Sequence, residues 1–149
     1  MEHFKYPSIP NLTAKDIIEA RSQETILSVS EKMHGANLSF CRTDEKDFIC
    51  SRNVILKPED DFFGYKDIVE KYIEQFSMMA KYIMTVKPAH DVRLFGELAG
   101  ADVQNNADYG ELDFYAFDLF VDFERVHEYE FIKLILNSGW NPGYNIKTA

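Results

Sequence analysis

The chain has no long hydrophobic run and few cysteines. No apolar stretch approaches the roughly 20 residues that a membrane-spanning helix needs, and the segment from Met1 to Pro7 lacks the apolar part of a signal peptide. The two cysteines, Cys41 and Cys50, have no metal-ligand spacing. They lie on neighbouring predicted strands, where a disulfide is geometrically possible, but a reduced pair is the expectation for a cytoplasmic protein. We therefore expect a cytoplasmic protein without a membrane segment.

Basic side chains are also scarce relative to acidic ones. Sixteen Lys and Arg stand against 25 Asp and Glu, a formal net charge of −9. A protein that coats nucleic acid needs a basic surface to neutralise phosphates, so that class is excluded, although a local basic groove is not. The acidic runs at Glu59–Asp61 and between Asp102 and Asp113 are typical of solvated faces rather than metal sites.

What the chain does have is the composition of a packed globular protein. Its 149 residues are 46% hydrophobic and include 12 Phe and 8 Tyr. That length suits a single domain, residues 1–149, with an aromatic-rich core. No internal repeat or low-complexity segment interrupts it.

The pattern of apolar residues predicts strands and helices in alternation. Period-two alternation predicts strands, and apolar residues at helical spacing predict one long helix and two shorter ones, the first opened by an N-cap at Thr13. This order predicts an α+β fold of antiparallel sheets with flanking helices. The predicted strands are 25–32, 37–42, 47–52, 92–97 and 113–121, and the predicted helices are 13–21, 65–85 and 127–137.

The segment Lys32–Asn37 joins the first two predicted strands and contains a lysine followed by His34 and Gly35. Glycine lets the backbone come close to a ligand or adopt a positive φ. The layout presents one amine at the mouth of a sheet, where a phosphate could meet it. By itself, this short and common pattern favours a surface lysine on an ordinary hairpin.

Two further polar residues stand at predicted strand ends. Arg52 ends the strand that adjoins the lysine loop, either within reach of a shared ligand or as a rim arginine. Glu97 follows Gly96 at the end of its strand, a position that suits a ribose hydroxyl, a hydrated metal or plain solvent.

Asp118 interrupts the dense apolar strand at 113–121. A buried unpaired carboxylate is costly, so this residue either pairs, for instance with an arginine, or faces a site. In an ideal strand Phe117 points the opposite way, so one of the two could line a pocket. The aromatic residues of Asp61–Tyr65 are expected to dock the long helix on the sheet.

Taken together, these segments resemble the motifs of ATP-dependent RNA ligases. Lys32–Asn37 fits the motif I pattern Lys-x-His-Gly-x-Asn of the RNA ligase 2 family, which includes the kinetoplastid RNA-editing ligases. DNA ligases and capping enzymes usually carry Asp where His34 stands, so this residue selects the RNA-ligase branch. The other matches, in order between Phe4 and Val121, are Ser51-Arg52 (motif Ia), Asp61–Tyr65, Phe95–Glu97 (motif III) and Phe114–Asp118 (motif IIIa).

The resemblance implies a partial nucleotidyltransferase catalytic domain of the ligase and capping-enzyme type. Lys32 would attack the α-phosphate of ATP, with Mg²⁺ screening the phosphates, to give lysyl-AMP. The AMP would then activate the 5′-phosphate of an RNA for joining to a 3′-hydroxyl. The implied roles are ribose or phosphate binding by Asn37 and Arg52, a ribose hydroxyl for Glu97, adenine stacking for Phe117, the adenine edge for Glu31, and an activity-linked position for His34 and Asp118.

The chain departs from the family pattern after Val121. Motif IV, a Glu-Gly-x-x-x-Lys strand, and the lysines of motif V have no counterpart there, and Pro10 stands where many relatives carry an acid. We therefore expect the N-terminal portion of a truncated or split ligase. In a split ligase, a second polypeptide would supply the missing strands. The alternatives are a non-catalytic module that binds ATP or an RNA end, and an interaction remnant without a ligand.

Overall fold

The structure is a computed structural model that describes residues 2–23, 32–100, 103, 109–138 and 140. The strand predicted from Thr25, Glu31, and most of the loop predicted between Leu98 and Gly110 lie outside the described residues. Among the helices that are described, none combines the length and the apolar character needed to cross a membrane.

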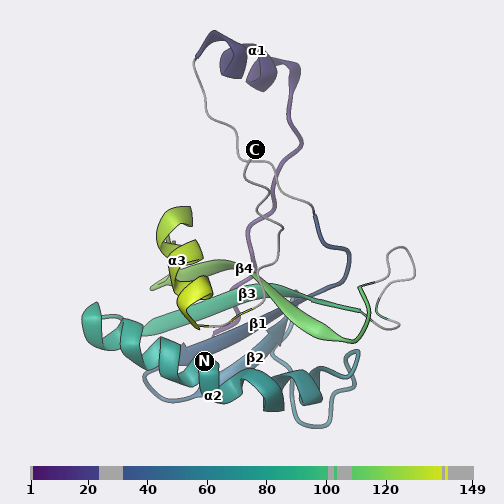
Figure 1. Ribbon diagram of the computed structural model, residues 1–149, viewed down its shortest axis with the longest axis vertical. Coiled ribbons are helices and arrows are strands. Elements are labelled where there is room, and N and C mark those ends of the chain that lie inside the picture. The colour runs from purple at the N-terminus through teal and green to yellow at the C-terminus, as the bar shows by residue number, and fades with distance from the viewer. Residues whose placement is uncertain (1, 24–31, 101–102, 104–108, 139, 141–149) are drawn as a thin grey trace.

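A five-stranded antiparallel sheet forms the centre of the molecule, with the strand order β2-β1-β3-β4-β5 (Figure 1). Every neighbouring pair is antiparallel. The predicted α+β class with antiparallel strands is confirmed. The strands are β1 (Ala36–Thr43), β2 (Asp47–Ser51), β3 (Asp91–Ala99), β4 (Asp113–Val121) and β5 (Glu124–Arg125).

Two helices, α2 (Tyr65–Val86) and α3 (Glu128–Ser138), pack against one face of this sheet. The apolar residues of α2 recur every three or four positions, so they form one stripe along the helix. Burial of each large apolar side chain in this stripe, such as Phe76, contributes about 1.5–3 kcal/mol. Rings from the sheet and from Trp140 complete this core. The buried residues of α2 are Tyr65, Ile68, Tyr72, Phe76, Met79, Ala80 and Ile83.

The helix α1 (Ala14–Ser22) stands apart from the sheet and has no buried residue (Figure 1). The predicted N-cap is confirmed: the Thr13 side chain accepts from the backbone N–H of Asp16, and the Asp16 carboxylate accepts from the backbone N–H of Thr13. Such a capping box satisfies two of the free N–H groups at the helix start. Local capping rather than burial therefore defines where this helix begins.

The second face of the sheet is covered by the N-terminal segment, which we define as residues 2–9. Phe4 and Tyr6 both lay their rings on this face, where each contacts Phe95 and Phe120 with centroid distances of 5.2–6.2 Å. Residues two apart in an extended chain share a face, which explains why these two rings contact the same strands. The predicted irregular lead-in is thus a structural layer.

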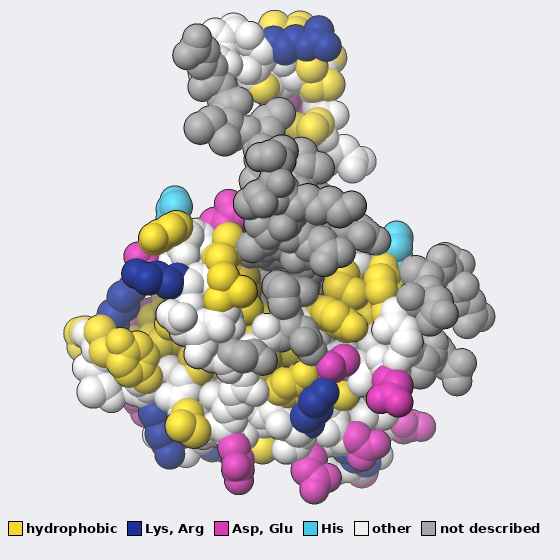
Figure 2. Space-filling view, in the orientation of Figure 1, with side chains coloured by type: hydrophobic (Ala, Val, Ile, Leu, Met, Phe, Trp, Pro, Cys, Tyr) yellow, Lys and Arg dark blue, Asp and Glu magenta, His cyan; other side chains and the backbone are white. Residues whose placement is uncertain are grey.

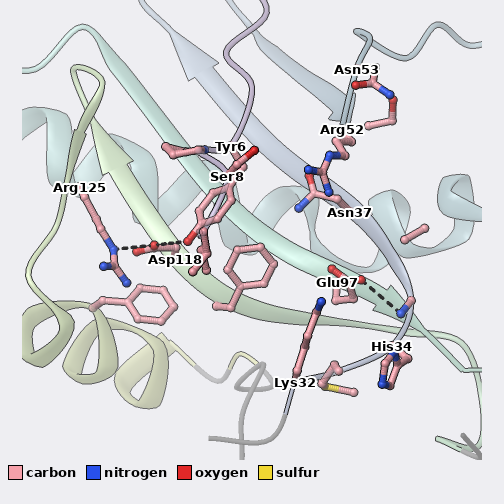
Figure 3. Close-up of a pocket in the computed structure, with 18 of the residues that line it drawn as sticks. Tyr6, Ser8, Lys32, His34, Asn37, Arg52, Asn53, Glu97, Asp118 and Arg125 are labelled. Atoms are coloured by element: carbon pink, nitrogen blue, oxygen red, sulfur yellow. Dashed lines mark hydrogen bonds and ion pairs between the residues drawn. The ribbon is translucent and has the colours of Figure 1, made fainter. Parts of the chain in front are cut away.

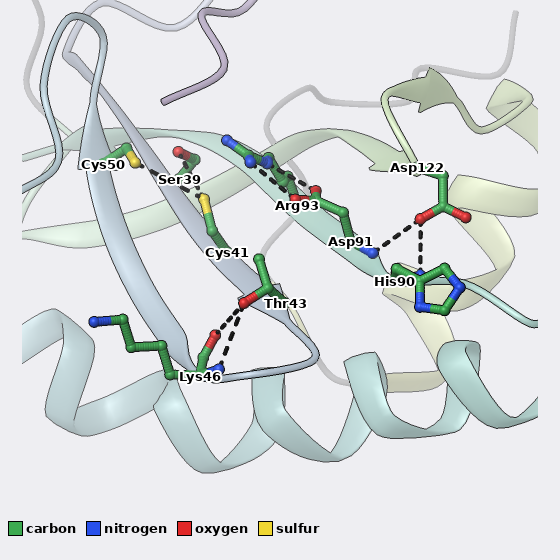
Figure 4. A network of polar contacts seen from close by, with 9 residues as sticks. All are labelled: Ser39, Cys41, Thr43, Lys46, Cys50, His90, Asp91, Arg93 and Asp122. Carbon is green, nitrogen blue, oxygen red and sulfur yellow. Dashed lines mark hydrogen bonds and ion pairs between the residues drawn. The ribbon is translucent and has the colours of Figure 1, made fainter. Parts of the chain in front are cut away.

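Further along the second face, Arg93 is paired with Asp91, close to Cys41 and Cys50 (Figure 4). The centroids of three aromatic rings lie 5.1–5.8 Å from the Arg93 guanidinium carbon. Both cysteines are free and buried, with 4.0 Å between their Sγ atoms. Their expected position on neighbouring strands is confirmed, since β1 pairs with β2.

The strand predicted to end at Glu97 continues to Ala99, which corrects the expected position of Glu97. Leu98 and Ala99 are fully buried and pair with β4, so the ladder extends past the glutamate. Glu97 consequently lies inside β3, directly opposite Asn37 of β1. It is not a solvated strand end.

A β-bulge in β4 corrects a second expectation. Phe95 pairs with Asp118, but the next residue, Gly96, pairs with Ala116, so Phe117 is an extra residue in the ladder. A bulge of this kind turns consecutive side chains towards the same side. An ideal strand would point Phe117 and Asp118 in opposite directions. Because of the bulge, both side chains lie on the second face of the sheet.

Candidate active site

An open cavity of about 1060 Å³ lies on the second face of the sheet, around the start of β1. The cavity is built by segments that are far apart in the sequence but neighbours in the sheet or packed on it (Figure 3). Its lining residues include Tyr6–Ile9, Lys32–Asn37, Ser51–Asn53, Phe62, Glu97, Phe117, Asp118, Arg125, Glu128 and Phe131.

The structure brings the predicted site residues together in this cavity. All of them except Glu31, which lies outside the described residues, line its wall: Lys32, His34, Asn37, Arg52, Glu97, Phe117 and Asp118. Their roles are not tested by this arrangement and stay predictions. What the geometry adds is that four separate motif segments share one space.

The antiparallel register explains how these residues meet. Asn37 and Glu97 are cross-strand partners, and side chains directly opposite each other have Cβ atoms about 4.5–5.5 Å apart. Leu38 pairs with Ser51 on the other side of β1, which brings Arg52 next to Asn37. Figure 3 shows the Lys32 amine approaching the same space from the loop before β1.

Gly35 fixes the lysine loop on β3. A Cβ at this position would lie 2.2 Å from the carbonyl oxygen of Leu98, so no side chain fits there. The close approach lets the Gly35 N–H donate to Glu97 Oε1 at 3.2 Å, and the next N–H back, that of His34, donates to the hydroxyl of Tyr109. The glycine thus serves a close approach to the sheet rather than a positive φ.

Glu97 combines burial with two neighbouring cations. Burial raises the pKa of its carboxyl group, while the Gly35 N–H and the positive charges of Lys32 and Arg52 oppose that rise. A carboxylate next to cations can accept hydrogen bonds from hydroxyl groups while the cations meet an anion. The arrangement suits a ligand that carries both hydroxyl groups and an anionic group.

Asp118 fulfils both parts of its prediction, since it pairs with an arginine and also faces the cavity. It is 1% exposed, and its Oδ2 accepts from Arg125 Nε at 2.6 Å and from the Tyr6 hydroxyl at 2.9 Å. Burial raises the pKa of this carboxyl group, and the bonds from Tyr6 and Arg125 oppose that rise. The carboxylate is therefore held in one orientation at the cavity wall.

Tyr6 and Arg125 are residues that sequence reasoning missed. A signal for Tyr6 existed in the Phe4-x-Tyr6 alternation, which indicates an extended segment with one aromatic face. The expectation that Asp118 needs an arginine had a candidate in Arg125, seven residues further on.

The segment Asp61–Tyr65 does only part of what was predicted. Tyr65 is buried and Phe62 packs against the core, so both dock α2 as expected. Phe63 is 50% exposed, which contradicts a docking role for that ring. Phe62 also lines the cavity, so the segment contributes to the site.

On the face of the molecule shown in Figure 2, charge among the described residues is mixed rather than grouped. In Figure 2, the Lys and Arg side chains of the described residues are interrupted by acidic and apolar ones on the face in view. Across the described residues, no three His, Cys, Asp or Glu side chains are grouped so that they could share a metal ion. Positive charge in the cavity comes from Lys32, Arg52 and Arg125.

Comparison with known proteins defines the class to which this fold belongs. Solved structures of the RNA ligase of Naegleria gruberi, a nucleotidyltransferase-type ligase, have the same fold. A mutant described with ATP and Mn matches with a TM-score of 0.61 at 22% identity, over 75% of this chain and 32% of that one. A mutant described with AMP and Mn matches with a TM-score of 0.60 at 22% identity, over 77% and 34%.

The family model described as RNA ligase matches residues 25–147. The chain belongs to the RNA ligase family, as its motifs predicted. It spans about a third of the length of the solved ligases that it matches.

Proposed function

We propose that this chain is the part of an ATP-dependent RNA ligase that takes up an adenylyl group on Lys32. The observation that carries the proposal is the shared cavity, in which one lysine stands beside Arg52, Asn37, Glu97 and the ring of Phe117. A nucleotide offers a complementary partner to each of these groups: a phosphate, ribose hydroxyls and a flat base.

In this proposal the nucleotide lies across the second face of the sheet. Phe117 is half-buried in the cavity wall, which leaves ring surface for stacking on adenine. Glu97 accepts a hydrogen bond from a ribose hydroxyl, while Arg52 and Asn37 hold the ribose or the α-phosphate. Support comes from the matching ligase structures, which are described with ATP, AMP and Mn.

The proposed first step forms a phosphorus–nitrogen bond. The neutral Lys32 amine attacks the α-phosphorus of ATP, the bond to the β-phosphate oxygen breaks, and pyrophosphate leaves with that electron pair. The amine loses its proton to solvent, which gives a lysyl-AMP phosphoramidate. Arg52, which lines the same cavity, helps to draw the triphosphate towards Lys32.

Magnesium is proposed as part of the substrate, bound to the phosphate oxygens of ATP, since phosphates and water are the ligands it prefers beside carboxylates. It would neutralise charge on the leaving pyrophosphate.

The later steps act on RNA. The 5′-phosphate of an RNA attacks the adenylyl phosphorus and releases Lys32, and a 3′-hydroxyl then displaces AMP to join the strands. These steps belong to the whole ligase, of which this chain spans about a third by comparison with solved relatives. A second polypeptide that supplies further strands is part of the proposal for these steps only.

Intact-protein mass after incubation with ATP and Mg²⁺ tests the first step. We expect a gain equal to one adenylyl group, and its loss in Lys32→Ala and in Lys32→Arg, which keeps the charge but lacks a nucleophilic amine. Lys46→Ala removes an exposed lysine at the turn between β1 and β2 (Figure 4) and should leave the gain intact.

The outcomes separate the candidate functions. An adduct that survives in Lys32→Ala would contradict the assigned nucleophile. A protein that forms no adduct but melts at a higher temperature with ATP would be a binding module instead. If ATP produces neither an adduct nor a higher melting temperature, the proposal of a nucleotide site is contradicted altogether.

A further inference from the structure

We propose that Tyr6 is a positioning residue of the nucleotide cavity, which orients both the Phe117 ring and the Asp118 carboxylate from the N-terminal segment. The inference rests on the proposed function, because it concerns how that cavity holds a nucleotide. It assigns to residues 2–9 a direct part in the site.

Tyr6 contacts both members of the β4 bulge. Its hydroxyl donates to Asp118 Oδ2 at 2.9 Å, and its ring meets Phe117 edge to face, with centroids 5.1 Å apart and planes at 83°. Edge-to-face pairs of this kind are favourable beyond the area they bury. Figure 3 shows Tyr6 bonded to Asp118. One side chain thus restrains both this acid and the ring proposed to stack on adenine.

The N-terminal segment holds Tyr6 firmly enough for this role. The ring of Tyr6 also contacts Phe95 at 5.2 Å and Phe120 at 6.0 Å. Two residues earlier, Phe4 contacts Phe120 at 5.4 Å and Phe123 at 5.3 Å. The segment is therefore anchored on both sides of β4, and Tyr6 has little freedom to turn away from the cavity.

The other side-chain partner of Asp118 is far less restrained. Arg125 donates to the same oxygen, but its side chain is 64% exposed and has several rotatable bonds. The backbone N–H of Leu119 donates to Oδ1 at 3.1 Å. Tyr6 is thus the rigid side-chain donor to Oδ2, and an incoming ligand can displace Arg125 without freeing the carboxylate.

The chain offers a matched tyrosine for comparison. The Tyr72 hydroxyl donates to Asp113 Oδ1 at 2.6 Å, and this pair joins α2 to β4 on the opposite face of the sheet. Tyr72→Phe removes the same chemical group from a tyrosine–aspartate bond outside the cavity. Tyr6→Phe removes the hydroxyl while keeping the ring, and Tyr6→Leu removes the ring as well.

The experiment measures two quantities. The first is the titration of the Asp118 carboxyl carbon by NMR in the ligand-free protein. The second is the affinity for AMP, as a function of pH, by calorimetry. The side chains of Lys32, His34, Glu97 and Glu128 line the same cavity, but their ionisation is common to wild type and Tyr6→Phe and cancels in the comparison.

We expect the Asp118 titration to move to higher pH in Tyr6→Phe, because a hydrogen bond to the charged form is lost. AMP affinity should fall about threefold to tenfold near neutral pH, the size of one ordinary hydrogen bond, because the lost bond orients the site and does not itself contact the nucleotide. The acidic limb of its pH profile should move to higher pH. Tyr6→Leu should weaken AMP binding further, and Tyr72→Phe should change neither readout.

A failure of the proposed Tyr6 role can be told apart from a failure of the proposed nucleotide site. If the wild type binds AMP and Tyr6→Phe matches it in both titration and affinity, the role of Tyr6 is overturned while the nucleotide site stands. If the wild type does not bind AMP, both the nucleotide site and this role are overturned. Should Tyr6→Leu fail to fold, Tyr6→Phe, which keeps the ring packing, still decides the question.

Discussion

Glu97 lies half-buried within β3, where its carboxylate faces two cations and accepts the Gly35 N–H. Burial outweighs these favourable contacts, since the net effect is a raised pKa. The folded protein therefore holds the Glu97 proton more tightly than the unfolded chain does. The ionised form costs stability above the folded-state pKa, and that cost disappears as the pH falls below the unfolded-state value.

Glu97→Gln should consequently stabilise the protein while it impairs the site. The amide oxygen still accepts the Gly35 N–H, but no buried charge remains. We expect a higher melting temperature than wild type at neutral pH, and a gain that shrinks as the pH is lowered towards about 4. AMP affinity should fall at least about tenfold, the loss of one charge-assisted bond.

Thermal unfolding across that pH range and calorimetry with AMP would measure both effects. Glu111→Gln, at an exposed glutamate, is the matched control and should change neither. If the gain in melting temperature of Glu97→Gln over wild type were smaller at neutral pH than at acidic pH, burial of the Glu97 charge would not be what costs stability.

At such single positions, the sequence predicted a set of side chains that do line one cavity, but not how they are held there. Lys32, Arg52 and Glu97 were found because their residue types and order resemble ligase motifs. The steric need for Gly35 depends on a contact with Leu98, 63 residues further along, which no local pattern encodes. Contacts between distant residues are set by strand register.

The β4 bulge shows the same limit for a whole strand. The bounds of β4 were predicted correctly, because its apolar and aromatic content favours a strand. The bulge was not predicted, because apolar residues occupy both faces of this strand. There is therefore no alternation of apolar and polar residues whose interruption would reveal a bulge. The glycine opposite, Gly96, was the available sign, because glycine within a strand often marks a bulge.

Gly96→Ala should therefore disturb the cavity from the opposite strand. A Cβ there would lie 2.3 Å from the Phe114 ring and 2.6 Å from the Tyr115 carbonyl oxygen, so β4 must shift. We expect destabilisation of about 1–3 kcal/mol, as for overpacking elsewhere, together with loss of AMP binding. Urea unfolding and calorimetry measure the two effects.

Ala116→Gly is the control for this variant, because Ala116 is the cross-strand partner of Gly96. It removes a methyl group from the same pair and adds no collision, so some stability should be lost while AMP binding persists. Retention of full AMP affinity in Gly96→Ala would show that the bulge does not organise the site.

The two faces of the sheet differed in how far they could be predicted. The helical face follows from periodicity: the stripe along α2, with Ile68, Phe76 and Ile83, was predicted as core and is buried. The second face is covered by the N-terminal segment, which has no helical period and too few residues to establish a strand period. The site lies on that second face, so its wall was predicted less completely than the core.

The ion pair between Arg93 and Asp91 ties this second face together away from the cavity. Arg93 is 1% exposed, and its Nε and Nη2 each donate to a different Asp91 oxygen at 2.8 Å (Figure 4). Its guanidinium also stacks within 5.1–5.8 Å of the ring centroids of Phe4, Phe48 and Phe123. One arginine thus joins the N-terminal segment, β2, β3 and the turn after β4.

Arg93→Met should unfold the protein more easily, because it leaves the Asp91 carboxylate buried without its cation. Breaking a buried pair in this way typically costs about 3–5 kcal/mol. The double variant Arg93→Met with Asp91→Asn, which removes the charge as well, should recover part of that loss. Urea denaturation of the single and double variants measures both.

Arg42 provides the control, since it forms a similar pair with Asp47 at 3.0 Å on the helical face, where both side chains are 20–25% exposed. Arg42→Met should lower the free energy of unfolding by less than Arg93→Met does, because water can solvate the Asp47 carboxylate that remains. If Arg93→Met cost no more than Arg42→Met, burial would not be what makes the Arg93 pair important. The N-terminal segment would then be held mainly by its ring contacts and by the Tyr6–Asp118 hydrogen bond.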